Sequence, residues 1–171
     1  MGGSSSTIVG MTDAESQLLK DLLQHQPVAA LATLHRGAPA VSMVPFALLP
    51  DATGLLIHVS ALATHTRDMQ RKPEVSLLVT GTLQDAETPL ALPRVSVFGR
   101  ARALARDSDA YALARDVYLH KLPDAEPLFD FGDFSLFVIE PTSARFVAGF
   151  GRALSLTKRT WRGVWQNEGV S

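Results

Sequence analysis

The sequence predicts a mainly β (α+β) fold: a small barrel, closed or split, of six or seven antiparallel strands with about three peripheral helices. Short apolar segments alternate with turn residues from residue 28 to residue 148, and helical periodicity is confined to three stretches. The chain has 171 residues, of which 46% are hydrophobic, and this is enough for the core of one domain.

The first predicted element is a helix from about Asp13 to Gln24. Thr12 and Glu15 have the spacing of a capping box. Pro27 requires the helix to end before it. One apolar stripe at helical period follows the cap, formed by Leu18, Leu19, Leu22 and Leu23. The preceding residues 1–10 are rich in glycine and serine, and we expect them to form a flexible tail outside the fold.

Three β segments come next, over residues 28–34, 40–49 and 55–60, and the turns between them predict an antiparallel meander. Pro45 cannot donate to a ladder, so its strand belongs at an edge, a bulge or a strand start. Free backbone groups at an edge could bind a flat heteroaromatic ring, although an ordinary protected edge explains the pattern as well.

The remaining elements are a short helix over residues 63–71, a strand over 75–80, a loop over 82–92 and a long strand over 94–104. Gly99 is a candidate bulge in the long strand. A helix over 107–120 with Asp107 as its N-cap follows, then strands over 134–139 and 145–148 separated by a turn over 140–143. Residues 155–171 are expected to be a C-terminal tail.

Composition excludes several classes of function. The formal charge of -1 argues against nucleic acid as a partner. No cysteine is present, so thiol catalysis and iron–sulfur chemistry are excluded, and the five histidines have no metal-ligand spacing, which predicts no metal site. No apolar run suggests a membrane span and no secretory signal is visible, so the expected location is cytoplasmic.

The segment from Ser60 to Arg67 joins a strand to the start of a helix, where backbone N–H groups and the helix dipole attract anions. Hydroxyl groups and a guanidinium at such a point suit a phosphate monoester. The alternative is that Thr64 and Thr66 only cap a surface helix. The long strand carries three arginines at positions of the same parity, Arg94, Arg100 and Arg102, so their side chains are expected on one face of the strand. An ordinary solvated polar face shows this pattern.

Several segments together resemble the pyridoxamine 5'-phosphate oxidase-like flavin-binding split barrels. They are GAPAVSMVPF at 37–46, LIHVSALATHTRD at 56–68, PEVSLLV at 73–79, RVSVFGRA at 94–101 and FVAGFGRA at 146–153. The last segment looks most like the haem-utilisation branch, whose additional C-terminal domain has no counterpart here. The resemblance covers about residues 13–154 and implies an FMN-binding split-barrel domain over residues 11–154.

The resemblance implies a homodimer with FMN at the interface. Ser60, His65, Thr66 and Arg67 would lie near the flavin phosphate. The ring and ribityl chain would lie beside two neighbouring strands and one further polar residue, namely Ser42, Met43, Val44, Pro45, His58, Val59 and Arg94.

Departures from the oxidase pattern narrow the function. The oxidase has arginine where Ser42 stands and lysine where Ala47 and His65 stand, so Arg67 would have to supply the phosphate charge. Arg152 lies near the vitamin-binding position, but the tryptophan expected nearby is Val147.

No catalytic residue is identified, so three hypotheses remain. The first is an FMN-dependent oxidoreductase that acts with a small-molecule electron donor or acceptor. The others are a non-catalytic flavin- or haem-binding module and a dimeric scaffold whose ligand site has decayed.

Overall fold

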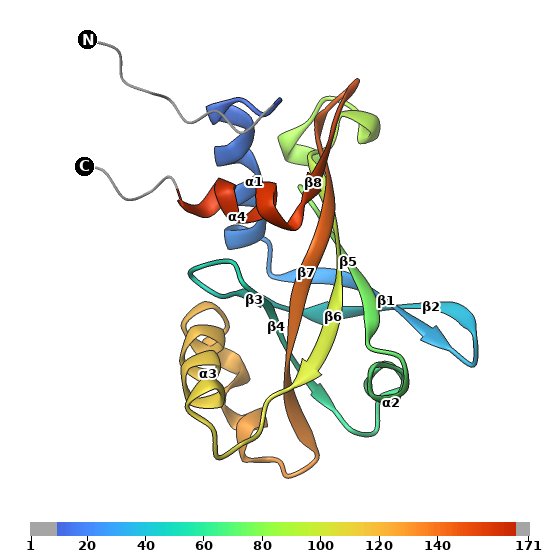
Figure 1. Cartoon of the computed structure of the whole chain (residues 1–171), viewed down its shortest axis with the longest axis vertical. Coiled ribbons are helices and arrows are strands. Elements are labelled where there is room, and N and C mark those ends of the chain that lie inside the picture. Colours follow the sequence, from blue (N-terminus) through green and yellow to red (C-terminus); the bar gives the residue numbers. More distant parts are fainter. Residues whose placement is uncertain (1–9, 167–171) are drawn as a thin grey trace.

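The computed structural model describes residues 10–166 and confirms the α+β split-barrel class (Figure 1). One antiparallel sheet of eight strands runs in the order β2-β1-β5-β6-β7-β4-β3, with β8 paired to β7. Its strands are β1 (Val28–His35), β2 (Ala38–Pro45), β3 (Ala47–Leu48), β4 (Leu55–Ser60), β5 (Glu74–Thr80), β6 (Arg94–Ala103), β7 (Phe134–Gly149) and β8 (Arg152–Thr157).

The helices lie around the sheet: α1 (Asp13–His25), α2 (Thr64–Arg71), α3 (Asp109–Lys121) and α4 (Lys158–Gln166), with 3-10 segments η1 (Leu83–Asp85), η2 (Pro89–Ala91) and η3 (Pro123–Asp130). The predicted capping box of α1 is confirmed, because Thr12 and Glu15 exchange both hydrogen bonds. The predicted N-cap of α3 is wrong by one residue. Ser108 takes that position, since its Oγ accepts from the backbone N–H of Tyr111.

The strand β7 differs from the prediction, which placed a turn over residues 140–143 between two strands. The chain continues through this segment as one strand that pairs with β6 along its length, while its other side pairs first with β4 and then with β8. The predicted irregularity at Gly99 is confirmed by a register shift between Phe98 and Gly99. A Cβ at Gly99 would lie 2.6 Å from the carbonyl oxygen of Glu140, so only glycine fits.

The C-terminal residues also differ from the expected tail over residues 155–171. Residues 152–157 form β8 and residues 158–166 form α4. Trp161 anchors this segment, because its buried indole N–H donates to the carbonyl oxygen of Ala52 at 2.9 Å. Residues 167–171 of the expected tail, and residues 1–9 of the expected N-terminal tail, lie outside the described residues.

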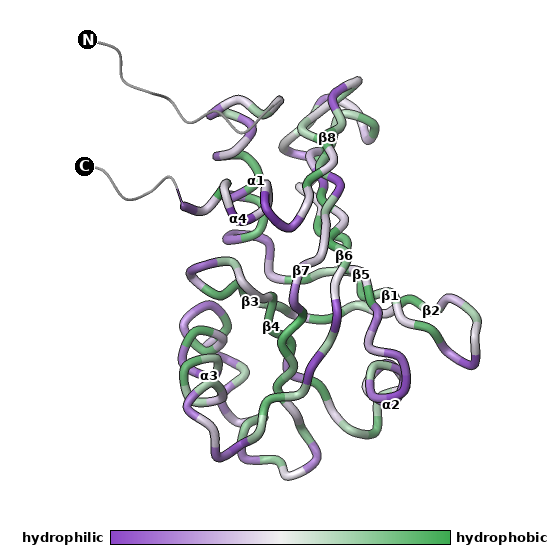
Figure 2. Tube along the Cα trace, viewed as in Figure 1, coloured by the Kyte–Doolittle hydropathy of each residue, from purple (hydrophilic) through white to green (hydrophobic). Residues whose placement is uncertain are grey.

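Two apolar clusters hold the fold together. The larger lies inside the curled sheet, and the smaller lies between α3, η3 and the outer sides of β4 and β7. The strand β4 is therefore buried on both faces, with Leu55, Ile57 and Val59 in the larger cluster and Leu56 in the smaller. Figure 2 shows the hydrophobic run along β4 and the hydrophilic character of α2. Within the described part of the chain, no helix is long and apolar enough to cross a membrane.

Candidate functional site

The predicted phosphate site lies where β4 ends and α2 begins, and its polar groups bond to one another. Ser60 Oγ donates to Asp133 Oδ2 at 2.7 Å and accepts from the N–H of Leu62 at 3.1 Å. Thr66 is fully buried, and its hydroxyl donates to the Ser60 carbonyl at 2.7 Å. Asp133 brings a carboxylate to Ser60, and a like charge there disfavours a phosphate.

The next pair joins the edge strand to α2. Ser42 Oγ on β2 lies 3.0 Å from His65 Nδ1, and both side chains are half-buried. Burial lowers the pKa of His65, and the charge of nearby Asp68 opposes this effect. The imidazole is therefore neutral at neutral pH, with Nδ1 engaged by a hydroxyl group.

A basic depression of about 170 Å³ lies beside this pair, lined by His35, Arg36, Thr64, Arg67, Asp68 and Arg71. Arg67 and Arg71 are four residues apart on α2, so they project from the same face of the helix. Arg67 is exposed and makes a long bond of 3.4 Å to the carbonyl of Leu62. Cations from two elements surround a small opening, and this arrangement suits an anionic group.

The sequence prediction missed part of this depression. Arg71 could have been found from its helical spacing to Arg67. Asp68 has no local signal: its carboxylate is 2.9 Å from His35 Nδ1 and accepts from Thr33 Oγ1 at 3.0 Å, both across more than thirty residues. The hydrogen bond from His35 is the largest cause that lowers the pKa of Asp68, followed in the same direction by that from Thr33.

His58 does not join the other predicted site residues. Strand alternation turns it to the opposite side of β4 from Val59, where its ring stacks on Phe129 at 3.8 Å between centroids. Both ring nitrogens are buried without a hydrogen-bond partner. Burial, with a smaller contribution from Arg106, lowers its pKa to about 4. His58 is therefore a neutral core residue in this structure.

The other β2 residues point to two different sides. Val44 is buried in the larger cluster, as is Val59 of β4, so neither offers a side chain to a ligand here. On the face of the strand opposite to Val44, Met43 is 66% exposed and Pro45 is also exposed. This exposed face of β2 is open to another molecule.

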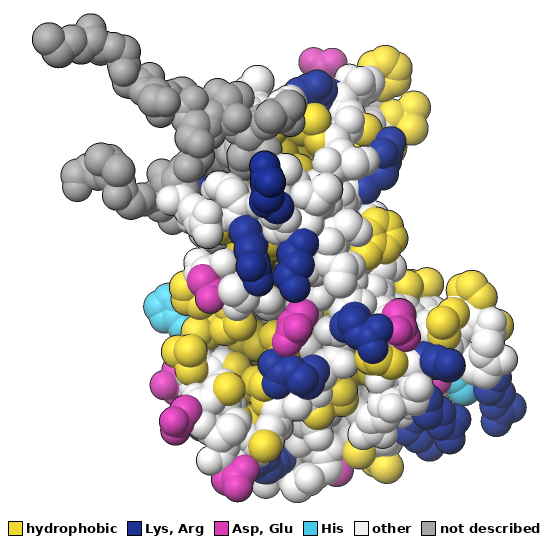
Figure 3. Space-filling view, in the orientation of Figure 1, with side chains coloured by type: hydrophobic (Ala, Val, Ile, Leu, Met, Phe, Trp, Pro, Cys, Tyr) yellow, Lys and Arg dark blue, Asp and Glu magenta, His cyan; other side chains and the backbone are white. Residues whose placement is uncertain are grey.

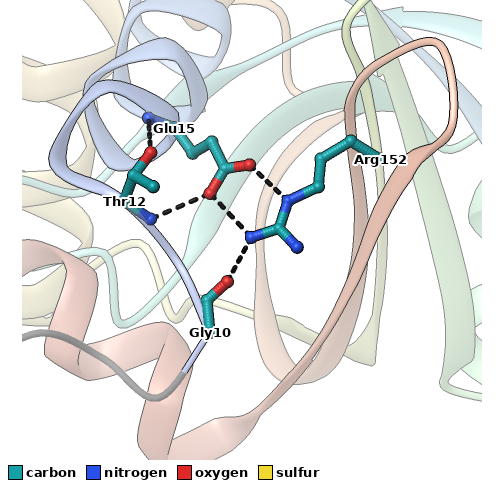
Figure 4. A network of polar contacts seen from close by, with 4 residues as sticks. All are labelled: Gly10, Thr12, Glu15 and Arg152. Atoms are coloured by element: carbon teal, nitrogen blue, oxygen red, sulfur yellow. Dashed lines mark hydrogen bonds and ion pairs between the residues drawn. The ribbon is translucent and has the colours of Figure 1, made fainter.

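Arg94 and Arg152 are held elsewhere. Arg94 donates to the carbonyls of Leu90 and Leu92, so it fixes the loop before its own strand. Arg152 bonds to Glu15 at 2.5 Å and to the carbonyl of Gly10 (Figure 4). It therefore ties the β7–β8 hairpin to the start of α1.

Part of the predicted set of site residues comes together at one place. The groups that come together are Ser42, Ser60, His65, Thr66 and Arg67, with the arginines of the depression beside them. No cluster of three or more potential metal-ligating side chains occurs among residues 10–166. The fold and these residues define a split-barrel domain with a polar, cationic site at the junction of β2, β4 and α2.

The chain belongs to the pyridoxamine 5'-phosphate oxidase family, whose model matches residues 16–148. It is 40% identical over 119 residues to the chloroplastic heme oxygenase HOZ of Arabidopsis thaliana, which covers 70% of this chain and 35% of HOZ. It is 27% identical over 141 residues to the heme oxygenase HutZ of Vibrio cholerae serotype O1, with coverage of 81% and 79%.

A solved structure supports the same relationship. The heme binding protein from Mycobacterium smegmatis superposes with a TM-score of 0.77 at 28% identity, over 90% of this chain and 61% of the other. The chain thus spans about a third of HOZ and about three fifths of the mycobacterial protein.

Proposed function

We propose that this protein is a haem-binding member of the family and that it works as a homodimer. The observation that carries the proposal is the identity of 40% to a heme oxygenase, together with the likeness to HutZ and to a heme binding protein. Binding is the step proposed here, because the arginines of the depression and the imidazole of His65 are groups that can hold a ligand.

The side chains around α2 fit the chemistry of haem. His65 is neutral, and in the tautomer whose Nδ1–H donates to Ser42 the lone pair of Nε2 is free for iron. Arg67 and Arg71 line the adjacent depression, where guanidinium groups could pair with the propionates. When bound, haem would supply a redox-active iron, and these residues would hold and orient it.

The exposed face of the sheet supports the homodimer. Met43, Ala30 and Leu78 form one cross-strand row, and Val41, Ala32, Ser76 and Phe98 form the next. Val41 is 73% exposed, Met43 66% and Phe98 45%, so this face is both apolar and open. Such a patch is typical of a protein interface, and a second copy placed here would lie next to the β2 edge of the site.

The test is a titration of the purified protein with haemin, followed by its absorption spectrum. We expect the parent protein to give a Soret band that saturates as haemin is added. In the double variant Arg67→Glu, Arg71→Glu, the apparent affinity for haemin should fall at least tenfold. The double variant Lys72→Glu, Lys158→Glu is the control for added negative charge. Absence of saturable binding by the parent protein would refute the proposal.

FMN is the second candidate, because the matching family is that of pyridoxamine 5'-phosphate oxidase and the arginine-lined depression also suits a phosphate. A flavoprotein oxidoreductase acting on a small electron donor or acceptor would follow from it. A yellow protein whose extracted chromophore is FMN, and which retains this FMN when haemin is added, would favour this reading.

The cytoplasm stays the proposed location.

A further inference from the structure

An open cavity of about 680 Å³ lies between α1, α3 and the β3–β4 turn, away from α2. Its walls are mainly apolar, from Leu23, Leu48, Leu49, Val117 and Trp165. Figure 3 shows hydrophobic side chains gathered between the part that holds α1 and α4 and the part that holds α3, with a histidine at the edge. The volume falls in the range of small-molecule sites, about 300–1,000 Å³.

Lys121 brings to this apolar cavity a cation that faces carbonyl groups at the end of α1 and an aromatic ring but pairs with no carboxylate of the described residues. Its Nζ donates to the carbonyls of Gln26 at 2.7 Å and Leu23 at 3.1 Å, and it lies 3.9 Å from the centre of the Phe46 ring. Among residues 10–166, no ion pair includes Lys121. Burial lowers its pKa to about 8, because an apolar environment disfavours the charged form.

Three further polar groups line the same cavity. The indole N–H of Trp165 is buried with no acceptor in the described part of the chain, and an unmet donor is costly. Asp116 lies on the exposed rim, where its carboxylate competes with any other anion. His120, also exposed, lines the rim as well.

We propose that this cavity binds an apolar monocarboxylic acid, with the hydrocarbon body against the leucines and Trp165 and the carboxylate at Lys121. A carboxylate would pair with the lysine, which forms no ion pair with the acidic side chains of residues 10–166, and the mainly apolar walls suit a ligand that carries a single charge. The cavity is separate from the β2–α2 site, so the proposal and its test do not depend on haem binding.

The experiment uses naphthalene-2-carboxylate, with the neutral naphthalene-2-carboxamide as its matched probe, in ¹H–¹⁵N correlation spectra of the full chain. The two tryptophans provide an internal comparison. The Trp165 indole signal should shift saturably, whereas that of Trp161, whose N–H is bonded to Ala52, should stay in place. The acid should bind about tenfold more tightly than the amide, as expected for one charge-assisted contact. The Nζ titration of Lys121 should also move to higher pH.

Variants separate charge from shape. Lys121→Met should make the acid bind no better than the amide, and Asp116→Asn should tighten binding of the acid alone. Because Lys121→Met also loses two bonds to α1, Asp116→Asn keeps the test valid if that variant is unstable. Lys72→Met, exposed at the end of α2, is the control. Equal binding of acid and amide to the parent protein, or no saturable shift of Trp165, would overturn the proposal.

Discussion

At the scale of single residues, Arg152 is a stabilising contact between the two ends of the described chain. Its side chain is 48% exposed, and the partner Glu15 is 14% exposed. The hydrogen bond from Arg152 is the largest cause that lowers the pKa of Glu15 from 4.5 to about 2, followed by the capping bond from Thr12. A depressed carboxyl pKa stabilises the fold above pH 4.5, and this contribution is lost as the pH falls toward 2.

We therefore expect Arg152→Ala to lower the free energy of unfolding at neutral pH by a small but measurable amount. This loss should shrink as the pH falls toward 2, because Glu15 then becomes protonated in the folded as well as in the unfolded parent protein. Urea denaturation at several pH values measures it. Arg115→Ala, which removes a looser and exposed pair with Glu126 at 3.7 Å, is the control. A loss for Arg152→Ala that does not vary with pH would contradict this role.

His58 leads to a second prediction about the dependence of stability on pH. Its folded-state pKa of about 4 lies below the ordinary 6.5, so the unfolded chain binds the proton more readily. Stability should thus fall as the pH drops from 6.5 to 4. His58→Phe should keep the stacking on Phe129 and remove on the order of 2 kcal/mol of this dependence. A stability that does not fall between pH 6.5 and 4 would contradict this role of His58.

At the scale of elements, the sequence predicted the features that depend on residues close together in the chain. The capping box defined the start of α1, and the prolines after α1, α2 and α3 marked where those helices end. The continuity of β7 could not be predicted, because it depends on partners far along the chain. The extra residue Thr142 is accommodated by the register shift, and its hydroxyl donates to the Phe98 carbonyl. Helix α4 was missed because its apolar residues are few and its exposed face is basic.

Gly99 offers a test of this element. Gly99→Ala should cost at least about 2 kcal/mol, because the new Cβ would meet backbone atoms of Glu140 that cannot move without breaking the β6–β7 ladder. Gly132→Ala is the control, since a Cβ there would meet nothing within 4 Å. Thermal unfolding of both variants measures the difference. Equal melting temperatures would mean that β6 and β7 are not packed as closely as described.

At the scale of the whole molecule, the fold brings together only part of the set of site residues that the sequence predicted. The junction of β4 and α2 was predicted, and Ser42 and His65 do meet there. The prediction could not show that Asp133 bonds Ser60 or that His58 faces the second core, because both depend on how distant strands pair. Which side of β2 is exposed also depends on this pairing.

The exposed sheet face leads to a prediction about assembly. Met43→Glu and Phe98→Glu each place a charge in an open apolar row, so each should shift a dimer toward monomer without unfolding the chain. Light scattering over a dilution series measures the mass. Leu113→Glu, on the exposed side of α3, should leave the mass unchanged. A parent protein that stays monomeric at high concentration would rule out the proposed interface.

Native mass spectrometry of the protein mixed with equal amounts of haemin and FMN tests the central claim most directly, because it reports ligand and assembly together. The account predicts a dimer that carries two haem groups and no FMN. A monomer, or a dimer that takes up FMN and leaves haem free, would contradict it.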